Sequence, residues 1–188
     1  MRCFVALVPS RSLVDLVAGW GEEVFAPLPW ARPLPPESLH VTLAFLGELD
    51  SAAVERAGEI VDAVDPRRVE LHLGPALVGV PRRRPRVLAL TAAGEGVAGL
   101  HERVTDSLAA ADLFERDSRT FWPHLSVARI RRGALDGRRG KAVVEALPRL
   151  VGVAAVPHPA SRLVLYRSDF GPERATYTAL AQIGLTGV

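Results

Sequence analysis

The pattern of apolar and polar positions divides the chain into alternating strands and helices. Residues 3–8 form an apolar run that predicts a strand, and apolar positions at helical spacing over residues 13–24 predict a helix after it. Ser12 and Asp15 stand three residues apart, as in a capping box, and predict the start of this helix. A proline-rich stretch at residues 27–36 separates this unit from the rest of the chain.

The next part of the chain predicts a strand, a helix and two more strands. Residues 40–46 have the composition of a strand, which Gly47 closes. Residues 53–64 carry apolar side chains on one helical face, and residues 69–78 and 86–91 are strand-like segments on either side of an arginine-rich loop. The order so far is strand, helix, strand, helix, strand, strand.

The second half of the chain repeats much of this order. Helices are predicted over residues 97–111 and 138–147, and strands over 124–130, 151–156, 162–167 and 176–183. Each half therefore reads as helix, histidine-bearing strand, helix, strand, strand. We predict a single bilobal α+β domain over residues 1–188, with duplicated halves at about 10–91 and 95–168, whose two lobes face each other across a cleft.

Composition places the chain among globular proteins. With 188 residues, of which 48% are hydrophobic, the chain can bury a sizeable core without disulfides. The single cysteine, Cys3, lies in an apolar run and is expected to be a buried structural thiol. The apolar run at the N-terminus is too short for a secretory signal, and no stretch approaches the length of a membrane span. We therefore expect a soluble cytoplasmic protein.

Positive charge is concentrated in arginine clusters. The formal net charge is only +2, yet one of the 23 basic residues is lysine and the others are arginine, gathered at residues 82–86, 129–132 and 138–141. Guanidinium groups can bind phosphate in a bidentate manner. The alternative is that these are solvated loop arginines that reflect a bias in composition. We favour phosphate contact most for residues 129–132.

Two short segments share the order histidine, apolar, hydroxyl, apolar. The first carries His40 and Thr42, and the second carries His124 and Ser126. Side chains alternate between the faces of a strand, so each histidine shares one face with its hydroxyl while the apolar neighbours point to the core. A lone motif of this kind arises often by chance, but two copies in matching contexts are more specific.

The residue types in these motifs suit phosphodiester hydrolysis by an activated water. An imidazole titrates near pH 6.5, so a facing pair can hold one neutral ring as base and one protonated ring as acid. Hydroxyl groups can donate to phosphate oxygens, and this set requires no metal. The sequence contains no glycine-rich phosphate loop, His-Glu-x-x-His motif, paired cysteines or nucleophile elbow. We predict structural roles for His72, His101 and His158, with zinc binding as the weaker alternative.

The chain resembles the two-histidine (2H) phosphoesterases. Within them it is most similar to the bacterial and archaeal RNA 2',3'-cyclic phosphodiesterases, also called 2'-5' RNA ligases, which are LigT-like. The resemblance covers nearly the whole chain. Besides the two histidine motifs, it rests on residues 2–7, 35–39, 85–88, 122–123 and 164–166.

The resemblance implies both a fold and a reaction. The fold has two pseudo-symmetric antiparallel sheets flanked by helices around a central cleft. The reaction is hydrolysis of a terminal 2',3'-cyclic phosphate of RNA, for example on tRNA fragments, to a 2'-phosphate, without metal or cofactor. It implies that His40 protonates the departing 3' oxygen and His124 activates water, or the reverse. Thr42 and Ser126 would hold the phosphate, although threonine is usual at the position of Ser126.

Phe45 and Arg129 stand at equivalent places, five residues after each histidine. Family members use these positions to stack a base and to contact phosphate, so the resemblance adds both residues to the substrate site. Strict alternation would place them on the core face. A bulge, a strong strand twist or the end of the strand is therefore needed to redirect them.

Three other functions remain open at this stage. The same site could join RNA ends reversibly by a 2'-5' bond without ATP, with a 5'-hydroxyl in place of water. It could act on a small cyclic nucleotide, or the protein could be a non-catalytic RNA-binding module, which the arginine clusters and the pI of about 9.2 would favour. The expected partner is RNA with a 2',3'-cyclic phosphate end, bound by a monomer with no membrane association.

Overall fold

The computed structural model describes residues 1–188 apart from 66, 117–119, 136, 154–155, 172–174 and 186–188, and apart from the side chains of residues 137–139. In chain order its elements are β1 (Arg2–Pro9), α1 (Arg11–Phe25), β2 (Ala31–Pro33), the 3-10 helix η1 (Pro36–Ser38), β3 (Val41–Glu48), α2 (Ser51–Asp62), β4 (Glu70–Val80), β5 (Val87–Ala93), α3 (Val97–Ala110), β6 (His124–Ile130), α4 (Gly137–Glu145), β7 (His158–Phe170) and β8 (Ala175–Gly184).

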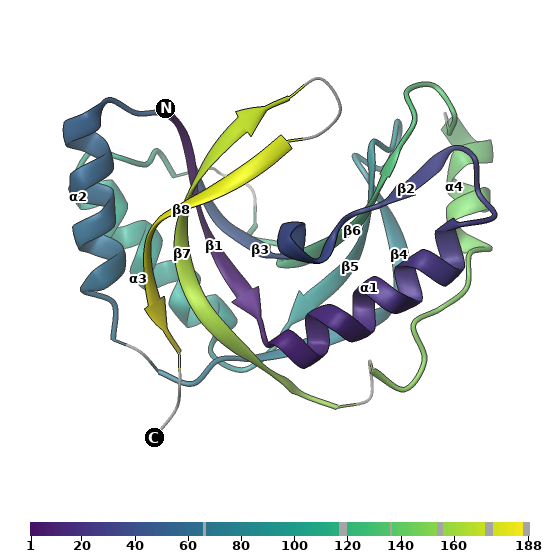
Figure 1. The fold of residues 1–188 in the computed structure, drawn as a ribbon, viewed down its shortest axis with the longest axis horizontal. Coiled ribbons are helices and arrows are strands. Elements are labelled where there is room, and N and C mark those ends of the chain that lie inside the picture. The colour runs from purple at the N-terminus through teal and green to yellow at the C-terminus, as the bar shows by residue number, and fades with distance from the viewer. Residues whose placement is uncertain (66, 117–119, 136, 154–155, 172–174, 186–188) are drawn as a thin grey trace.

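Eight strands form an antiparallel sheet in the order β1-β3-β6-β5-β4-β7-β8, with β2 paired to β6. Because β1 also pairs with β7, the path of strands closes on itself. Two joints in this path are short: β3 and β6 share the pair Val41–Leu125, and β4 and β7 share two pairs. The joints separate two groups of strands, β3-β1-β7-β8 and β2-β6-β5-β4 (Figure 1). The predicted α+β class with two antiparallel sheets is confirmed, with the sheets joined rather than separate.

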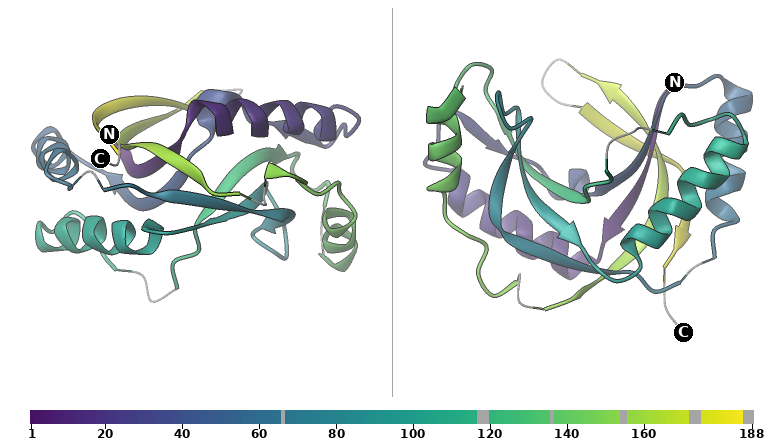
Figure 2. Two further views of the ribbon diagram at one scale, coloured as in Figure 1. Left: turned by 90° about the horizontal axis from the view of Figure 1, so that it is seen from below. Right: turned by 180° about the vertical axis from the view of Figure 1, so that it is seen from behind.

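Helices cover the two groups at opposite ends of the molecule (Figures 1 and 2). Helices α2 and α3 contact β8, β7 and β3 of the first group, whereas α1 and α4 contact β2, β6 and β4 of the second. Each group therefore takes strands from both halves of the chain. The duplication at about 10–91 and 95–168 stays a prediction, and its halves would be interleaved in space.

The core lies between the sheet and the helices. Along β1, Cys3, Val5 and Leu7 are fully buried in the main apolar cluster. The Cys3 thiol is thus buried, as predicted, and burial raises its pKa. Among the described residues, no helix is long and apolar enough to span a membrane.

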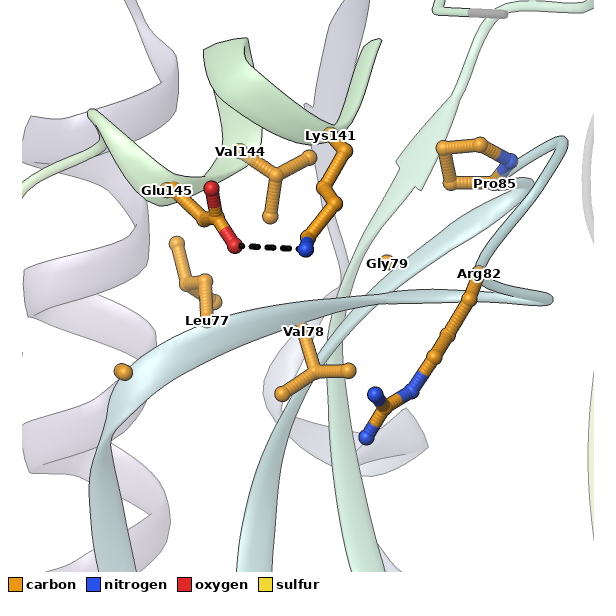
Figure 3. A pocket seen from close by; sticks show the side chains of 9 residues that line it. Leu77, Val78, Gly79, Arg82, Pro85, Lys141, Val144 and Glu145 are labelled. Carbon is orange, nitrogen blue, oxygen red and sulfur yellow. Dashed lines mark ion pairs between the residues drawn. The ribbon is translucent and has the colours of Figure 1, made fainter. Parts of the chain in front are cut away.

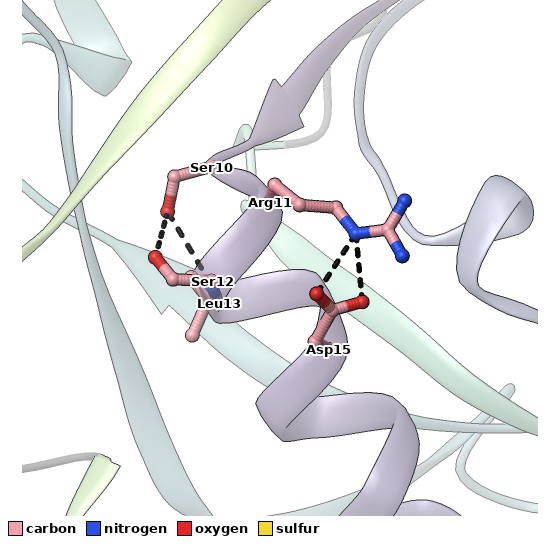
Figure 4. A network of polar contacts seen from close by, with 5 residues as sticks. All are labelled: Ser10, Arg11, Ser12, Leu13 and Asp15. Atoms are coloured by element: carbon pink, nitrogen blue, oxygen red, sulfur yellow. Dashed lines mark hydrogen bonds and ion pairs between the residues drawn. The ribbon is translucent and has the colours of Figure 1, made fainter.

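Helix α1 begins earlier than the sequence pattern indicated. Ser10 caps the helix, since its hydroxyl accepts a hydrogen bond of 3.4 Å from the Leu13 amide (Figure 4). Ser12 lies inside the first turn, and Asp15 accepts hydrogen bonds of 2.8 Å from Arg11 Nε. The prediction of a capping box at Ser12 and Asp15 was therefore wrong, because Ser10 already occupies the capping position.

Two further expectations differ from the structure. Residues 151–153 and 156, predicted as part of a strand, have no strand structure, and residues 154–155 lie outside the described part. Gly152 has φ +83°, in the left-handed region, which interrupts an extended chain at this point. Strand β2, inside the proline-rich stretch, was not predicted.

Candidate active site

The two histidine motifs meet where β3 and β6 touch. Val41 and Leu125 are the paired residues, and both are buried. Extending this antiparallel register by one residue on each side places His40 opposite Ser126 and Thr42 opposite His124. These four residues are partly exposed, whereas the apolar residues between them are buried. They therefore share one face, in a square in which each imidazole faces the hydroxyl of the other motif.

The two imidazoles lie at diagonal corners of this square. Diagonal neighbours on an antiparallel pair are about 7–8 Å apart, which leaves room for a phosphoryl group between the rings. Each ring interacts with the carbonyl of the residue two positions earlier in the chain. His124 Nδ1 is 2.9 Å from the Trp122 carbonyl oxygen. The Ser38 carbonyl raises the pKa of His40, whereas Nδ1 of His40 has no hydrogen-bond partner in the described part of the chain. In His124, Nε2 is then the nitrogen left for substrate.

His40 lies inside a cluster of aromatic rings. Its ring centroid is 5.0 Å from that of Phe4, 5.2 Å from that of Tyr177 and 6.1 Å from that of Tyr166. Burial lowers the pKa of His40 to about 4; the Ser38 carbonyl opposes this, and charge on His124 acts in the same direction as burial. His40 is therefore neutral in the free protein at pH 7.

His124 has different neighbours. The Trp122 ring stacks on it, with centroids 4.5 Å apart and an interplanar angle of 12°. Trp122 is itself 37% exposed. The stacked indole and the Trp122 carbonyl both come from the segment just before β6, so this local chain segment fixes the orientation of the His124 ring.

β-Bulges at equivalent positions redirect Phe45 and Arg129. On β3, the register with β1 shifts between the pairs Ala6–Thr42 and Val5–Ala44, so Leu43 is an extra residue. On β6, the register with β5 shifts in the same way between Ser126 and Ala128. On β3, Leu43 and Ala44 are both buried and Phe45 is exposed. On β6, Val127 and Ala128 are both buried and Arg129 is exposed.

The bulges thus place Phe45 and Arg129 on the face that carries the histidines, which we call the site face. For Phe45 the ring contacts support this, because its centroid is 5.8 Å from that of Phe4. The structure therefore brings the predicted residues together on one surface: His40, Thr42, Phe45, His124, Ser126 and Arg129.

Sequence reasoning missed three side chains of this surface. Arg32 of β2 pairs with Arg129 of β6, so two guanidinium groups stand on neighbouring strands. Phe4 and Tyr177 contact the His40 ring from β1 and β8. Alternation along β1 could have shown that Phe4 leaves the core face, but pairing with distant strands is what brings these residues to the histidines.

Two cavities lie beside the rings that contact His40 and share Pro36 and Tyr177, although neither histidine lines them. The larger, of about 710 Å³, is also lined by Leu39 and Tyr166. The smaller, of about 320 Å³, is lined by Arg32 and Arg129. The surface beside the His40 ring cluster therefore has room for more than a phosphate ion.

A separate cavity of about 280 Å³ lies between β4 and α4 (Figure 3). Leu77, Val78 and Val144 form its apolar walls, and Lys141 and Glu145 form an ion pair of 3.5 Å at its edge. Neither histidine lines it. Lys141 belongs to the third arginine-rich cluster; the side chains of the arginines at 138 and 139 lie outside the described part of the chain.

The other histidines lie away from this pair. His101 stacks on Phe121 with centroids 3.8 Å apart, His158 Nε2 is 2.9 Å from the Val153 carbonyl oxygen, and His72 is exposed on β4. Within the described part of the chain, no three His, Cys, Asp or Glu residues gather as metal ligands.

Comparison with known proteins relates this site to a family. Residues 8–89 match the family described as LigT like Phosphoesterase. A protein named RNA 2',3'-cyclic phosphodiesterase from Aquifex aeolicus (strain VF5) is 23% identical over 135 residues, which are 70% of this chain and 71% of that protein. One of the same name from Geobacillus stearothermophilus is 24% identical over 186 residues, which are 98% of this chain but 57% of that protein.

Solved structures share the fold over the full chain. TT0787 of Thermus thermophilus is 25% identical, with a TM-score of 0.76 and coverage of 100% of this chain and 99% of that one. E. coli LigT complexed with 3'-AMP is 23% identical, with a TM-score of 0.73 and coverage of 98% of both chains. The residues matched by the family include the first histidine motif, and the shared fold extends to the second. The chain is therefore similar to the LigT-like phosphoesterases, in sequence over residues 8–89 and in fold over its whole length.

Proposed function

We propose that this protein hydrolyses the 2',3'-cyclic phosphate at the end of an RNA to a 2'-phosphate, with His40 and His124 as the acid-base pair. The observation that carries the proposal is the square in which each imidazole lies opposite the hydroxyl of the other motif. The names of the curated relatives point to the same substrate.

In this reaction one histidine takes a proton from water as the water oxygen attacks phosphorus. The P–O3' bond breaks, and the other histidine gives its proton to the 3' oxygen. The products are a 3'-hydroxyl and a 2'-phosphate, and the histidines end with their protonation states exchanged. Thr42 and Ser126 donate hydrogen bonds to the phosphoryl oxygens, and Arg129 offsets their negative charge.

The pKa of His40 bears on which histidine is the acid. A neutral His40 is ready to act as the base, because Nε2 then carries a lone pair. If His40 is instead the acid, the bound phosphate must raise its pKa from about 4 toward the working pH. A titration of the His40 ring by NMR, with and without inorganic phosphate, separates these assignments.

The proposal is tested by product analysis on a short RNA that ends in a 2',3'-cyclic phosphate, with a chelator present. We expect conversion to a 2'-phosphate end, and a loss of about 10²- to 10⁴-fold in rate for His40→Ala and for His124→Ala. His72→Ala, at an exposed histidine on β4, is the matched control and should keep wild-type turnover. An untouched substrate, or near-normal rates in both active-site variants, contradicts the proposal.

A further inference from the structure

The site face continues beyond the histidine pair toward one edge of the molecule. On β7 the register with β8 is unbroken from Tyr166 to Phe170, so Tyr166, Ser168 and Phe170 lie on one face. Tyr166 contacts the His40 ring, which fixes this as the site face. Tyr177, paired with Ser168, confirms the assignment, because its ring also contacts that of His40.

An exposed aromatic ring with an arginine over it occupies this end of the face. Phe170 is 70% exposed, and the guanidinium carbon of Arg2 lies 5.2 Å from its ring centroid. Phe45 is 64% exposed on the same face. These two phenylalanines are the most exposed aromatic side chains that the structure describes. Exposed aromatic rings beside cationic groups bind single-stranded nucleic acid by stacking on its bases.

We propose that Phe170 and Arg2 form a subsite for a nucleotide upstream of the one that carries the cyclic phosphate. Phe170 stacks on its base, and the Arg2 guanidinium contacts the phosphate next to it. The preferred substrate is then a single-stranded RNA end rather than a free cyclic mononucleotide. This inference rests on the proposed function of the histidine pair.

The distance of Phe170 from Tyr166, which contacts the His40 ring, supports an upstream position. Phe170 lies four residues beyond Tyr166, which is about 13 Å along an antiparallel strand. A mononucleotide held at its phosphate by the histidine pair and at its base by Phe45 leaves Phe170 uncovered. A chain of two or more nucleotides can reach it.

The opposite end of β7 is less suited to the RNA chain. Arg162 and Arg11 line the cavity of about 710 Å³ there, but Glu37 lines it too. Arg162 donates a hydrogen bond of 2.9 Å to Gln182, and Arg11 is held by Asp15. These cations are already engaged, whereas the Arg2 guanidinium lies over an exposed ring.

The test compares a 2',3'-cyclic mononucleotide with a trinucleotide that ends in the same cyclic phosphate. For Phe170→Ala and for Arg2→Gln we expect kcat/KM on the trinucleotide to fall at least about fivefold, since base stacking is worth about 1–3 kcal/mol. The fall should come from KM, and the loss should be confined to the trinucleotide. Phe170→Trp should restore the wild-type value, because it keeps a stacking ring.

Two controls make the outcome specific. Leu16→Ala removes an apolar side chain that is 46% exposed on α1, and should affect neither substrate. Arg162→Ala tests whether the RNA chain instead runs toward the opposite end of β7. Equal losses on both substrates, no loss on either, or a trinucleotide-specific loss in Arg162→Ala instead would overturn the inference. If the wild-type protein turns over neither substrate, the proposed function itself fails.

Discussion

The surroundings of His40 and His124 differ although the backbone presents the two residues in the same way. Each histidine opens a strand segment with a bulge three residues on, and each interacts with the carbonyl of the residue two positions earlier. Yet His40 is enclosed by rings, whereas His124 is covered by one exposed indole. The backbone thus sets the positions of both histidines, and burial among the neighbouring rings lowers the pKa of His40.

The largest effect that we expect from this difference is on stability. His40 has a pKa of about 4 in the folded protein and about 6.5 when unfolded. As pH falls from 6.5 to 4, the unfolded chain binds a proton that the folded protein does not. The free energy of unfolding should therefore fall over this window, by on the order of 2–3 kcal/mol from His40.

This is measured by urea denaturation of the wild type and of His40→Gln at pH 7 and pH 4.5. The variant cannot titrate at this position, so it should lose less stability than the wild type between these values. Equal losses in the two proteins would show that the enclosure by Phe4 and Tyr177 leaves the ring free to protonate.

The hydroxyls should have the next largest effect. A hydrogen bond to a charged group is worth about 1.5–3 kcal/mol, so Thr42→Val and Ser126→Ala should each lower kcat/KM by about 10- to 100-fold. Thr178→Val, at an exposed position on β8, serves as the control for a lost surface hydroxyl. If kcat/KM of both active-site variants stays within about twofold of wild type, Thr42 and Ser126 do not donate hydrogen bonds to the phosphate.

The arginine pair of β2 and β6 should have a smaller effect. Arg129→Ala and Arg32→Ala should raise KM by about 5- to 10-fold at low salt, and by less at high salt, because exposed charges are screened. Arg131→Ala, in the same cluster as Arg129, is the control. A KM that rises equally in all three variants would indicate a general charge effect rather than a pair of phosphate contacts.

The smallest effect should come from opening the ring cluster. Phe4→Leu replaces one aromatic wall of His40 with a smaller side chain and lets water closer to the imidazole. The pKa of His40 should then rise toward 6.5, by about one unit or less, as followed by NMR. A further fall in the pKa would mean that the Phe4 ring favours the protonated imidazole, and would contradict this prediction.

The sequence was sufficient for the features that depend on local patterns. Strand β1 follows from its apolar run and strands β3 and β6 from their alternation. His40 and His124 share a face with their hydroxyls because side chains in a strand have a period of two. The bulges at Leu43 and Val127 could not be predicted, since they are defined by the register with β1 and β5. Local alternation alone gave the wrong face for Phe45 and Arg129.

Features that depend on distant or competing residues were also beyond local patterns. Ser10 and Ser12 are equally good capping residues, and only packing of the strand end decides between them. Tyr177 reaches His40 through the pairing of β8 with β7 and of β7 with β1, across more than half of the chain. The arginine pair of β2 and β6 likewise arises only when a short strand joins the sheet edge.

The closed path of strands limits how the protein can move. The two strand groups are joined by two strand pairings, β3 with β6 and β4 with β7. A hinge motion at either of these pairings would break hydrogen bonds at the other. We therefore expect the two groups of strands to move as one rigid body rather than to open and close. If the proposed function is right, we therefore expect hydrolysis to need no closing motion between the two strand groups.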